Sequence, residues 1–387
     1  MRLDILAPAE ADVVRIYVLY LAIVAGFVFA YGLTMAPAGP PVRLRLQVSG
    51  GEAVATIFLY VAISTVVLAI KRIYGLLDVE QHGDFYRNIA TMPVLMQQIF
   101  VTLSAMLLCT KIAVVGVLGA RSMLFSPAML LLIAFELLVN LDLAGNRREI
   151  VALFLILMIA VDLMSRPIRM TIALSLGAAA IAAFLLAGVA RAQLGAGTAP
   201  GLADAISTSS EFTSVFTTAH DVGQLKGSGM EGDLRAIVLL GPLLAVIPRQ
   251  FLPFDKTTPA DWYMETLYPE AADAGQGFAF GVAAEAATGW GWAEALARGA
   301  TIGLFLAFVA RRLRKGTLGL GWFIVALLLV IGSYDFFRVG VLWFLPFLTT
   351  RFLPLYLLLW GLARLFDRLA QAPGLPARPS HVRRAAP

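Results

Sequence analysis

The residues in this sequence with the clearest chemical potential are a pair of adjacent arginines. Arg147 and Arg148 stand in the segment Gly-Asn-Arg-Arg-Glu, immediately before an apolar run. Guanidinium groups bind phosphate in bidentate fashion and keep their charge at physiological pH. An arginine pair at the level of lipid headgroups therefore suits a diphosphate. The alternative is a helix-end anchor whose side chains reach up to the membrane interface.

Two further basic segments follow. The segment Ile247–Lys256 contains Arg249, Lys256 and two prolines, and proline restricts both its own backbone and that of the preceding residue. The basic groups would then be held in position for an anion, or the segment would be an amphipathic surface strip on anionic headgroups. Arg338, in Phe-Arg-Val-Gly, is another candidate phosphate contact, or it pairs with Asp335.

Acids and a histidine in the same half of the chain are candidate general bases. Glu211, His220 and Asp221 could take the proton of a sugar hydroxyl, or they are solvated loop residues. Glu285 lies in a run of small apolar residues, where an acid is costly unless it is paired or faces a cavity. The alternative for Glu285 is an exposed acid that caps a helix.

Other features indicate what this chain is not. Three histidines are too few to favour a multi-histidine metal site, and no Walker loop, dinucleotide fingerprint or HExxH motif is present. We therefore predict no metal and no cofactor. Lys111 and Glu136 lie in separate apolar runs, and a buried pair between them would be structural.

The composition shows which elements must position these residues. Apolar residues make up 59% of the 387 residues and charged residues only 14%, against about 45–50% and about 25% in soluble domains. Several soluble domains are thereby excluded, and an all-α polytopic membrane protein is predicted. The net charge of +5 does not indicate nucleic acid, because membrane proteins concentrate Lys and Arg in loops.

Apolar runs of roughly 20 residues mark the predicted spans. We predict nine to eleven transmembrane helices, the nine at 15–36, 52–70, 93–118, 123–143, 149–165, 170–190, 291–310, 318–334 and 340–366. The shorter run Ala236–Ile247 is predicted to be re-entrant or interfacial. The chain then divides into N-terminal transmembrane helices (1–190), one large periplasmic loop (191–290), C-terminal transmembrane helices (291–370) and a disordered basic tail (371–387).

The distribution of Lys and Arg sets the predicted orientation. The cluster Arg311–Lys315 and the tail after Arg364 should both be cytoplasmic, which places the loop 191–290 outside. That loop has 11 acids and five Lys or Arg. The same count puts Arg147 and Arg148 outside, but it also puts the pair Lys71-Arg72 outside, against the rule.

In their order along residues 140–350, these motifs resemble the Wzy-type polymerases of O-antigen and oligosaccharide repeat units. The matching motifs are Gly-Asn-Arg-Arg, Glu211-Phe212 at the start of the large loop, Ile-Pro-Arg followed by Pro and Lys, the acid and glycines around Glu285, and Phe-Arg-Val-Gly. The sequence departs from the family pattern after Lys256 and after Arg338.

The resemblance implies a GT-C-like glycosyltransferase of the bacterial inner membrane that works at the periplasmic face. Its substrate would be an undecaprenyl-diphosphate-linked oligosaccharide, and a chain-length regulator is a further candidate partner. The implied diphosphate-binding residues are Arg147, Arg148, Arg249, Lys256 and Arg338. The implied catalytic base is one of Glu211, His220 and Glu285.

Two other functions remain open from the sequence. An O-antigen ligase uses the same donor but transfers the glycan to lipid A–core. A polysaccharide transporter or lipid-linked glycan flippase would show matching halves and charges near the midplane of the membrane. The two halves of this chain do not match, which favours catalysis at a surface.

Overall fold

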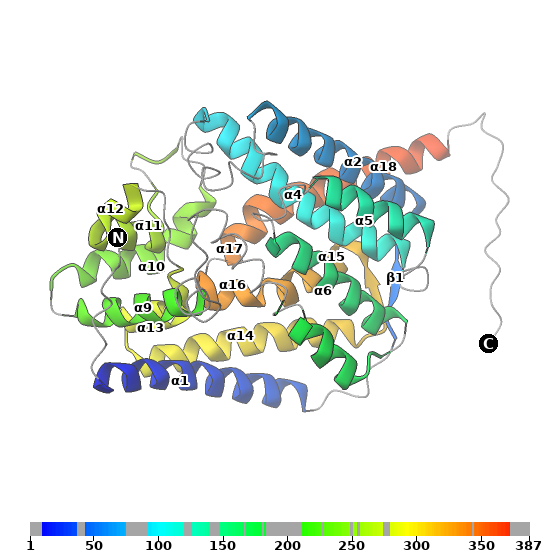
Figure 1. Cartoon of the computed structure of the whole chain (residues 1–387). Helices are drawn as coiled ribbons and strands as arrows, with labels where there is room; N and C mark the ends of the chain where they lie inside the picture. Colours follow the sequence, from blue (N-terminus) through cyan, green and yellow to red (C-terminus); the bar gives the residue numbers. More distant parts are fainter. Residues whose placement is uncertain are drawn as a thin grey trace.

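The computed structural model describes residues 10–36, 43–74, 92–119, 126–139, 147–165, 167–179, 182, 211–226, 228–247, 251–253, 256–273, 279–342 and 344–371. The fold is mostly helical, as predicted (Figure 1). The helices of the transmembrane regions are α1 (Glu10–Met35), α2 (Gly50–Ile73), α4 (Val94–Leu118), α5 (Pro127–Val139), α6 (Arg147–Met164), α14 (Trp292–Leu313), α15 (Leu320–Ile331) and α18 (Leu353–Ala370).

Five of the described helices are long and apolar enough to cross a membrane. They cover Val13–Met35, Gly50–Ile73, Val94–Leu118, Trp292–Leu313 and Leu345–Ala370. The last joins α17 (Phe344–Phe347), a π-helical turn (Leu348–Phe352) and α18. Four shorter apolar helices lie at Pro127–Val139, Ala152–Met164, Met170–Ala179 and Leu320–Ile331. Every predicted span thus contains an apolar helix, and five of the nine reach the length of a full crossing.

The large loop contains short helices in its described residues. They are α9 (Glu211–Gln224), α10 (Glu231–Val246), α11 (Pro259–Leu267), α12 (Pro269–Asp273) and α13 (Gly281–Ala287). Most of the run predicted to be re-entrant or interfacial lies in α10. Leu239, Leu240 and Leu243 are exposed there and give this helix an apolar side.

One end of the helix bundle is closed by a two-stranded parallel ribbon. Strand β1 (Arg45–Gln47) pairs with β2 (Thr317–Gly319), which follows α14. The Asp367 carboxylate, near the end of α18, accepts a 2.8 Å hydrogen bond from the Gly51 N–H at the start of α2. Near the end of α6, the Leu163 carbonyl accepts one of 3.0 Å from the Leu44 N–H. We call this end the ribbon end.

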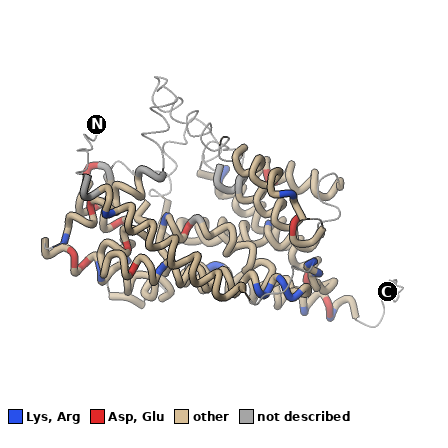
Figure 2. Tube along the Cα trace, turned by 90° about the horizontal axis from the view of Figure 1, so that it is seen from below, with Lys and Arg blue, Asp and Glu red and all other residues tan. Residues whose placement is uncertain are grey.

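The opposite end, which we call the loop end, holds α9 to α13 and the first turns of α1 and α14. Figure 1 shows the two ends on opposite sides of the molecule, with α9 to α12 at the left and β1 at the right. In Figure 2 basic residues gather near the start of the C-terminal tail, whereas acids and bases are mixed at the other side. The cluster Arg311–Lys315 directly precedes β2, and Asp367 bonds to Gly51 at the start of α2, so the clusters Arg311–Lys315 and Arg364–Arg368 share the ribbon end, as their predicted common side requires.

Helices α1 and α14 run side by side in the same direction. A Cβ atom at Gly299 or Gly303 would collide with the backbone carbonyl of Ile23 or Phe27, respectively. Glycine at both positions lets the two backbones approach closely, as small residues do between membrane helices. Because α14 starts at the loop end, α1 starts there as well.

A buried ion pair stabilises the bundle away from the loop end. Lys111 Nζ lies 2.7 Å from Glu136 Oε2, and the Tyr60 hydroxyl donates a 2.5 Å hydrogen bond to Glu136 Oε1. The predicted Lys111–Glu136 pair is thus confirmed. Lys71 is also buried, with Nζ 3.4 Å from the Val139 carbonyl oxygen. Lys71 is therefore not one of the exposed loop cations to which the positive-inside rule applies. Only Arg72 then conflicts with the predicted orientation, which places this pair outside.

Candidate functional site

Three segments singled out in the sequence pack together at the loop end, on α9, α13 and α16 (Ser333–Arg338). Thr218 on α9 donates a 3.1 Å hydrogen bond to the Ala279 carbonyl, and the Ala279 N–H donates one of 2.9 Å to Ser214 Oγ. Gly281 has a φ of 77°, and a Cβ there would lie 2.5 Å from Val215 and 2.9 Å from the Phe337 carbonyl oxygen. The start of α13 is thereby wedged between α9 and α16.

Glu285 on α13 is fully buried in a charged network. Its Oε2 atom accepts hydrogen bonds from Arg298 Nη1 at 2.5 Å and from the Val341 N–H at 3.1 Å. Arg298 also donates to Glu294 Oε1, at 2.7 Å from Nη2 and 3.0 Å from Nε. Gly340, with a φ of 119°, lies against the carboxylate, and a Cβ at this position would overlap it.

The electrostatics of Glu285 follow from its burial. Removal from water raises the pKa of Glu285 from 4.5 to about 7, while Arg298 and the Val341 N–H oppose this rise. Glu285 Oε1 has no hydrogen-bond partner among the described residues. The carboxyl group is thus poised to hold a proton near neutral pH, but it is closed off from solvent. Through its contacts with Arg298 and Val341, Glu285 connects α13 to α14 and to the turn after α16.

A second network is built around Asp221 on α9. The Tyr263 and Tyr268 hydroxyls donate to Asp221 Oδ2 at 2.6 and 2.7 Å, and His220 Nδ1 lies 3.0 Å from Asp221 Oδ1. Burial, followed by the Asp221 charge, raises the pKa of Tyr263. A carboxylate only accepts hydrogen bonds, so the proton of a neutral His220 ring is held on Nδ1.

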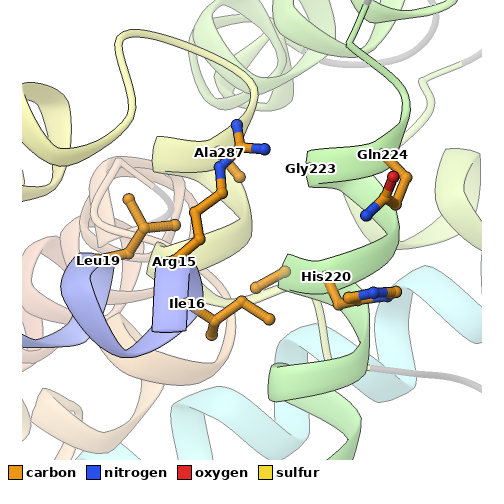
Figure 3. Close-up of a pocket in the computed structure, with 8 residues that line it drawn as sticks. Arg15, Ile16, Leu19, His220, Gly223, Gln224 and Ala287 are labelled. Atoms are coloured by element: carbon orange, nitrogen blue, oxygen red, sulfur yellow. The ribbon is translucent and has the colours of Figure 1, made fainter. Parts of the chain in front are cut away.

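His220 lines a shallow pocket between α1, α9 and α13 (Figure 3). The Arg15 side chain extends from α1 toward α13 beside Ala287, while Gln224 and His220 project from α9. Ile16 and Leu19 form an apolar wall. The pocket is thus lined by one cation, one amide and one imidazole together with apolar side chains.

The predicted base residues have different environments. His220 is partly exposed, with 22% of its side chain accessible, whereas Glu285 is inaccessible. Glu211 is the first residue of α9, and its side chain lies outside the described part of the chain. The His220 side chain is therefore partly open to solvent, whereas the Glu285 carboxylate is closed off from it.

The predicted phosphate ligands are only partly described. Arg147 and Arg148 are the first two residues of α6. The other end of α6 is hydrogen-bonded to Leu44 at the ribbon end, so the backbone of the two arginines lies roughly 24 Å from the ribbon end along the helix axis. Their side chains, and the whole of Arg249, lie outside the described residues.

The other two predicted ligands are described. Lys256 is exposed, its Nζ donates a 3.0 Å hydrogen bond to the Ala245 carbonyl, and partial burial lowers its pKa. Arg338 is half-buried at the end of α16 and stands two residues before Gly340. It is therefore close in the chain to the Glu285 network.

Two arginines of this end were not singled out from the sequence. Arg298 lies inside the apolar α14, four residues after Glu294, and this spacing was the available signal. Arg15 lies near the start of the chain and carries no local signal that relates it to residue 220. Among the described residues, no group of three or more His, Cys, Asp or Glu could hold a metal ion.

Comparisons with known proteins found no match to any family model, curated protein or solved structure.

Proposed function

We propose that this chain is an inner-membrane glycosyltransferase that polymerises undecaprenyl-diphosphate-linked oligosaccharide repeat units at the periplasmic face. The proposal rests on the motif order that resembles the Wzy-type polymerases. The observation that carries it is the convergence of three of those motifs, on α9, α13 and α16, at one end of an apolar helix bundle. A site at the end of a bundle suits a substrate whose lipid lies in the membrane and whose sugars lie in water.

The orientation follows from the positive-inside rule. The ribbon end carries Arg311–Lys315 and Arg364–Arg368, so it would face the cytoplasm, and the loop end would face the periplasm. Cys109, the single cysteine, is buried. A membrane-impermeant maleimide added to whole spheroplasts should therefore label Ser228→Cys at the loop end and spare Lys315→Cys. Labelling in the reverse pattern would refute the periplasmic site.

The chemistry assigned to the site is transfer of a growing glycan. The acceptor hydroxyl oxygen forms a bond to the anomeric carbon of the donor, and the bond from that carbon to the diphosphate oxygen breaks. The lipid diphosphate leaves with the electron pair, and the acceptor proton passes to Nε2 of His220. The Asp221 carboxylate holds the ring orientation and stabilises the imidazolium that results.

Cationic residues would stabilise the negative charge that builds on the leaving diphosphate. Arg147, Arg148, Arg249 and Arg338 are assigned this role. Glu285 is assigned to positioning, because it is inaccessible and binds α13 to Arg298 and to the turn that follows Arg338.

The decisive experiment is reconstitution of the purified chain with lipid-linked repeat units. Formation of glycans longer than one unit supports the polymerase. Transfer to added lipid A–core without lengthening would instead support a ligase. Movement of units across the bilayer with no new glycosidic bond would support a flippase and refute the proposal.

A further inference from the structure

The ribbon end carries an excess of positive charge that the proposed function does not use. Three segments meet there, because the Arg45 N–H donates a 2.7 Å hydrogen bond to the Gly316 carbonyl and Asp367 bonds to Gly51. Together they bring a set of Lys and Arg side chains to one end: Arg43, Arg45, Arg311, Arg312, Arg314, Lys315, Arg364 and Arg368. Figure 2 shows these basic residues gathered near the start of the C-terminal tail.

The acids of this end do not neutralise that charge. The carboxylates of Glu52, Asp162 and Asp367 accept hydrogen bonds from the backbone N–H groups of residues 49, 168 and 51, at 2.9, 2.8 and 2.8 Å. No salt bridge between described residues involves Arg312 or Arg364. The stretches that continue directly from these elements outside the described residues, 37–42, 120–125 and 372–387, contain no Asp or Glu.

Two of these arginines lie against exposed tryptophan rings. The Arg312 guanidinium carbon is 5.4 Å from the ring centroid of Trp322 on α15 and 5.3 Å from that of Phe308 on α14. The Arg364 guanidinium carbon is 3.8 Å from the ring centroid of Trp360 on α18. Both tryptophans are 46% exposed. Tryptophans on the outside of membrane helices mark the headgroup level of a bilayer, so both guanidinium groups are held near that level.

The stacked geometry leaves the donors of the two arginines available. A guanidinium group that lies over a ring uses its face, and its N–H groups point outward from its edge. No described residue accepts a hydrogen bond from Arg312 or Arg364, which contact only aromatic rings. Phosphate oxygens match these N–H groups in bidentate fashion. The partner that this surface lacks is therefore an anion in the headgroup layer.

We propose that the ribbon end binds anionic phospholipids, with Arg312 and Arg364 as ligands of the lipid phosphate. The aromatic rings beside the two arginines would pack against the upper part of the acyl chains. Below them the helices continue with exposed apolar residues, Leu304 on α14 and Leu357 on α18, which lipid chains would cover. A lipid matches both the charge and the apolar side, whereas an acidic protein segment matches the charge alone. The proposal does not depend on which reaction the chain performs.

The test uses quenching of tryptophan fluorescence by brominated lipids. The full chain is reconstituted in phosphatidylcholine vesicles with an increasing share of phosphatidylglycerol brominated on its acyl chains, and brominated phosphatidylcholine is the reference lipid. Phosphatidylglycerol should quench the wild type at a lower share of the lipid than the reference does. Equal quenching by the two lipids would overturn the proposal.

Substitutions locate the effect. Arg312→Gln should raise the share of phosphatidylglycerol needed for half of the extra quenching by about fivefold, which is the contribution of one basic residue at an anionic surface. Arg364→Gln should act in the same direction from a different helix. Trp322→Phe keeps an aromatic ring at this position and should remove part of the extra quenching. Full extra quenching in Trp322→Phe would show that the lipid binds elsewhere and overturn the assignment to Arg312.

The matched control is Arg235→Gln. Arg235 also lies over an exposed tryptophan, 5.9 Å from the ring centroid of Trp290, but at the loop end and two residues after Asp233. Its loss should change the half-quenching share by less than about twofold. Equal shifts in Arg235→Gln and Arg312→Gln would indicate general charge attraction and overturn the proposal. Removal of the extra quenching by soluble polyglutamate would favour an acidic protein segment instead and would also overturn it.

Discussion

The buried Glu285 carboxyl group should give the protein a stability that falls as the pH rises. Its pKa is raised from 4.5 to about 7, mainly by removal from water. At about 1.36 kcal/mol for each pH unit of difference, this corresponds to about 3 kcal/mol. Between these two pH values the folded chain keeps a proton that the unfolded chain releases. The contribution is therefore complete below pH 4.5 and is lost by the time the pH has passed through 7.

The variant Glu285→Gln has nearly the same shape and cannot titrate. The wild type should thus lose about 3 kcal/mol of stability relative to this variant as the pH rises from 4 to 8. With about 2.1 cal/mol/K of unfolding entropy per residue over 387 residues, the relative shift in Tm is about 4 °C. The change in intrinsic tryptophan fluorescence on heating the detergent-solubilised protein measures it.

The sign of this shift tests the reasoning. If the wild type instead gains stability relative to Glu285→Gln as the pH rises, attraction to Arg298 outweighs burial and the carboxylate is ionised at neutral pH. Glu270→Gln removes an exposed acid from the same end and controls for the loss of one negative charge. Its Tm difference from the wild type should change by less than about 1 °C over the same range.

Three further substitutions test the rest of the structure. Asp221→Asn should reduce glycan lengthening by about 100-fold or more, because the His220 ring loses the carboxylate that orients it, and normal ladders on a gel would remove the pair from catalysis. Lys111→Met should lower the free energy of unfolding by about 3–5 kcal/mol by removing the cation beside the buried Glu136 carboxylate, and adding Glu136→Leu should restore most of it; equal thermal unfolding of single and double variants would contradict this pairing. Gly340→Ala should cost about 1–3 kcal/mol because of its positive φ and its contact with Glu285, and an unchanged Tm would show that the turn can relax.

The apolar runs in the sequence were enough to predict the helices. Each of the nine predicted spans contains an apolar helix, because roughly 20 apolar residues have few alternatives to a helix in lipid. The lengths were less predictable. The predicted run at 318–334 contains a helix of 12 residues, which ends at Ile331. Hydropathy alone does not show where a helix ends within an apolar segment.

The candidate site could be predicted only in part. Glu285 drew attention because an acid in an apolar run needs a partner, and the structure supplies Arg298 as that partner. The sequence could relate Arg298 to Glu294 through their four-residue spacing, but not to Glu285, because 13 residues and a helix start separate those two positions. Arg15 and His220 are about 200 residues apart, and no periodicity relates positions at such a separation. Contacts of this kind follow from helix packing and not from local pattern.

The packing that brings Arg15 to His220 depends on α1 and α14. Gly299 and Gly303 lie one helical turn apart on α14 and allow its backbone to approach Ile23 and Phe27 on α1. Arg15 lies eight residues before Ile23, about 12 Å along the axis toward the loop end. The height of Arg15 relative to α13 is therefore fixed by glycines that do not line the pocket. A larger residue at Gly299 would collide with the Ile23 backbone and displace α1 and with it Arg15, so the arrangement of α1 against α9 at the loop end depends on glycines within the membrane packing of α1 and α14.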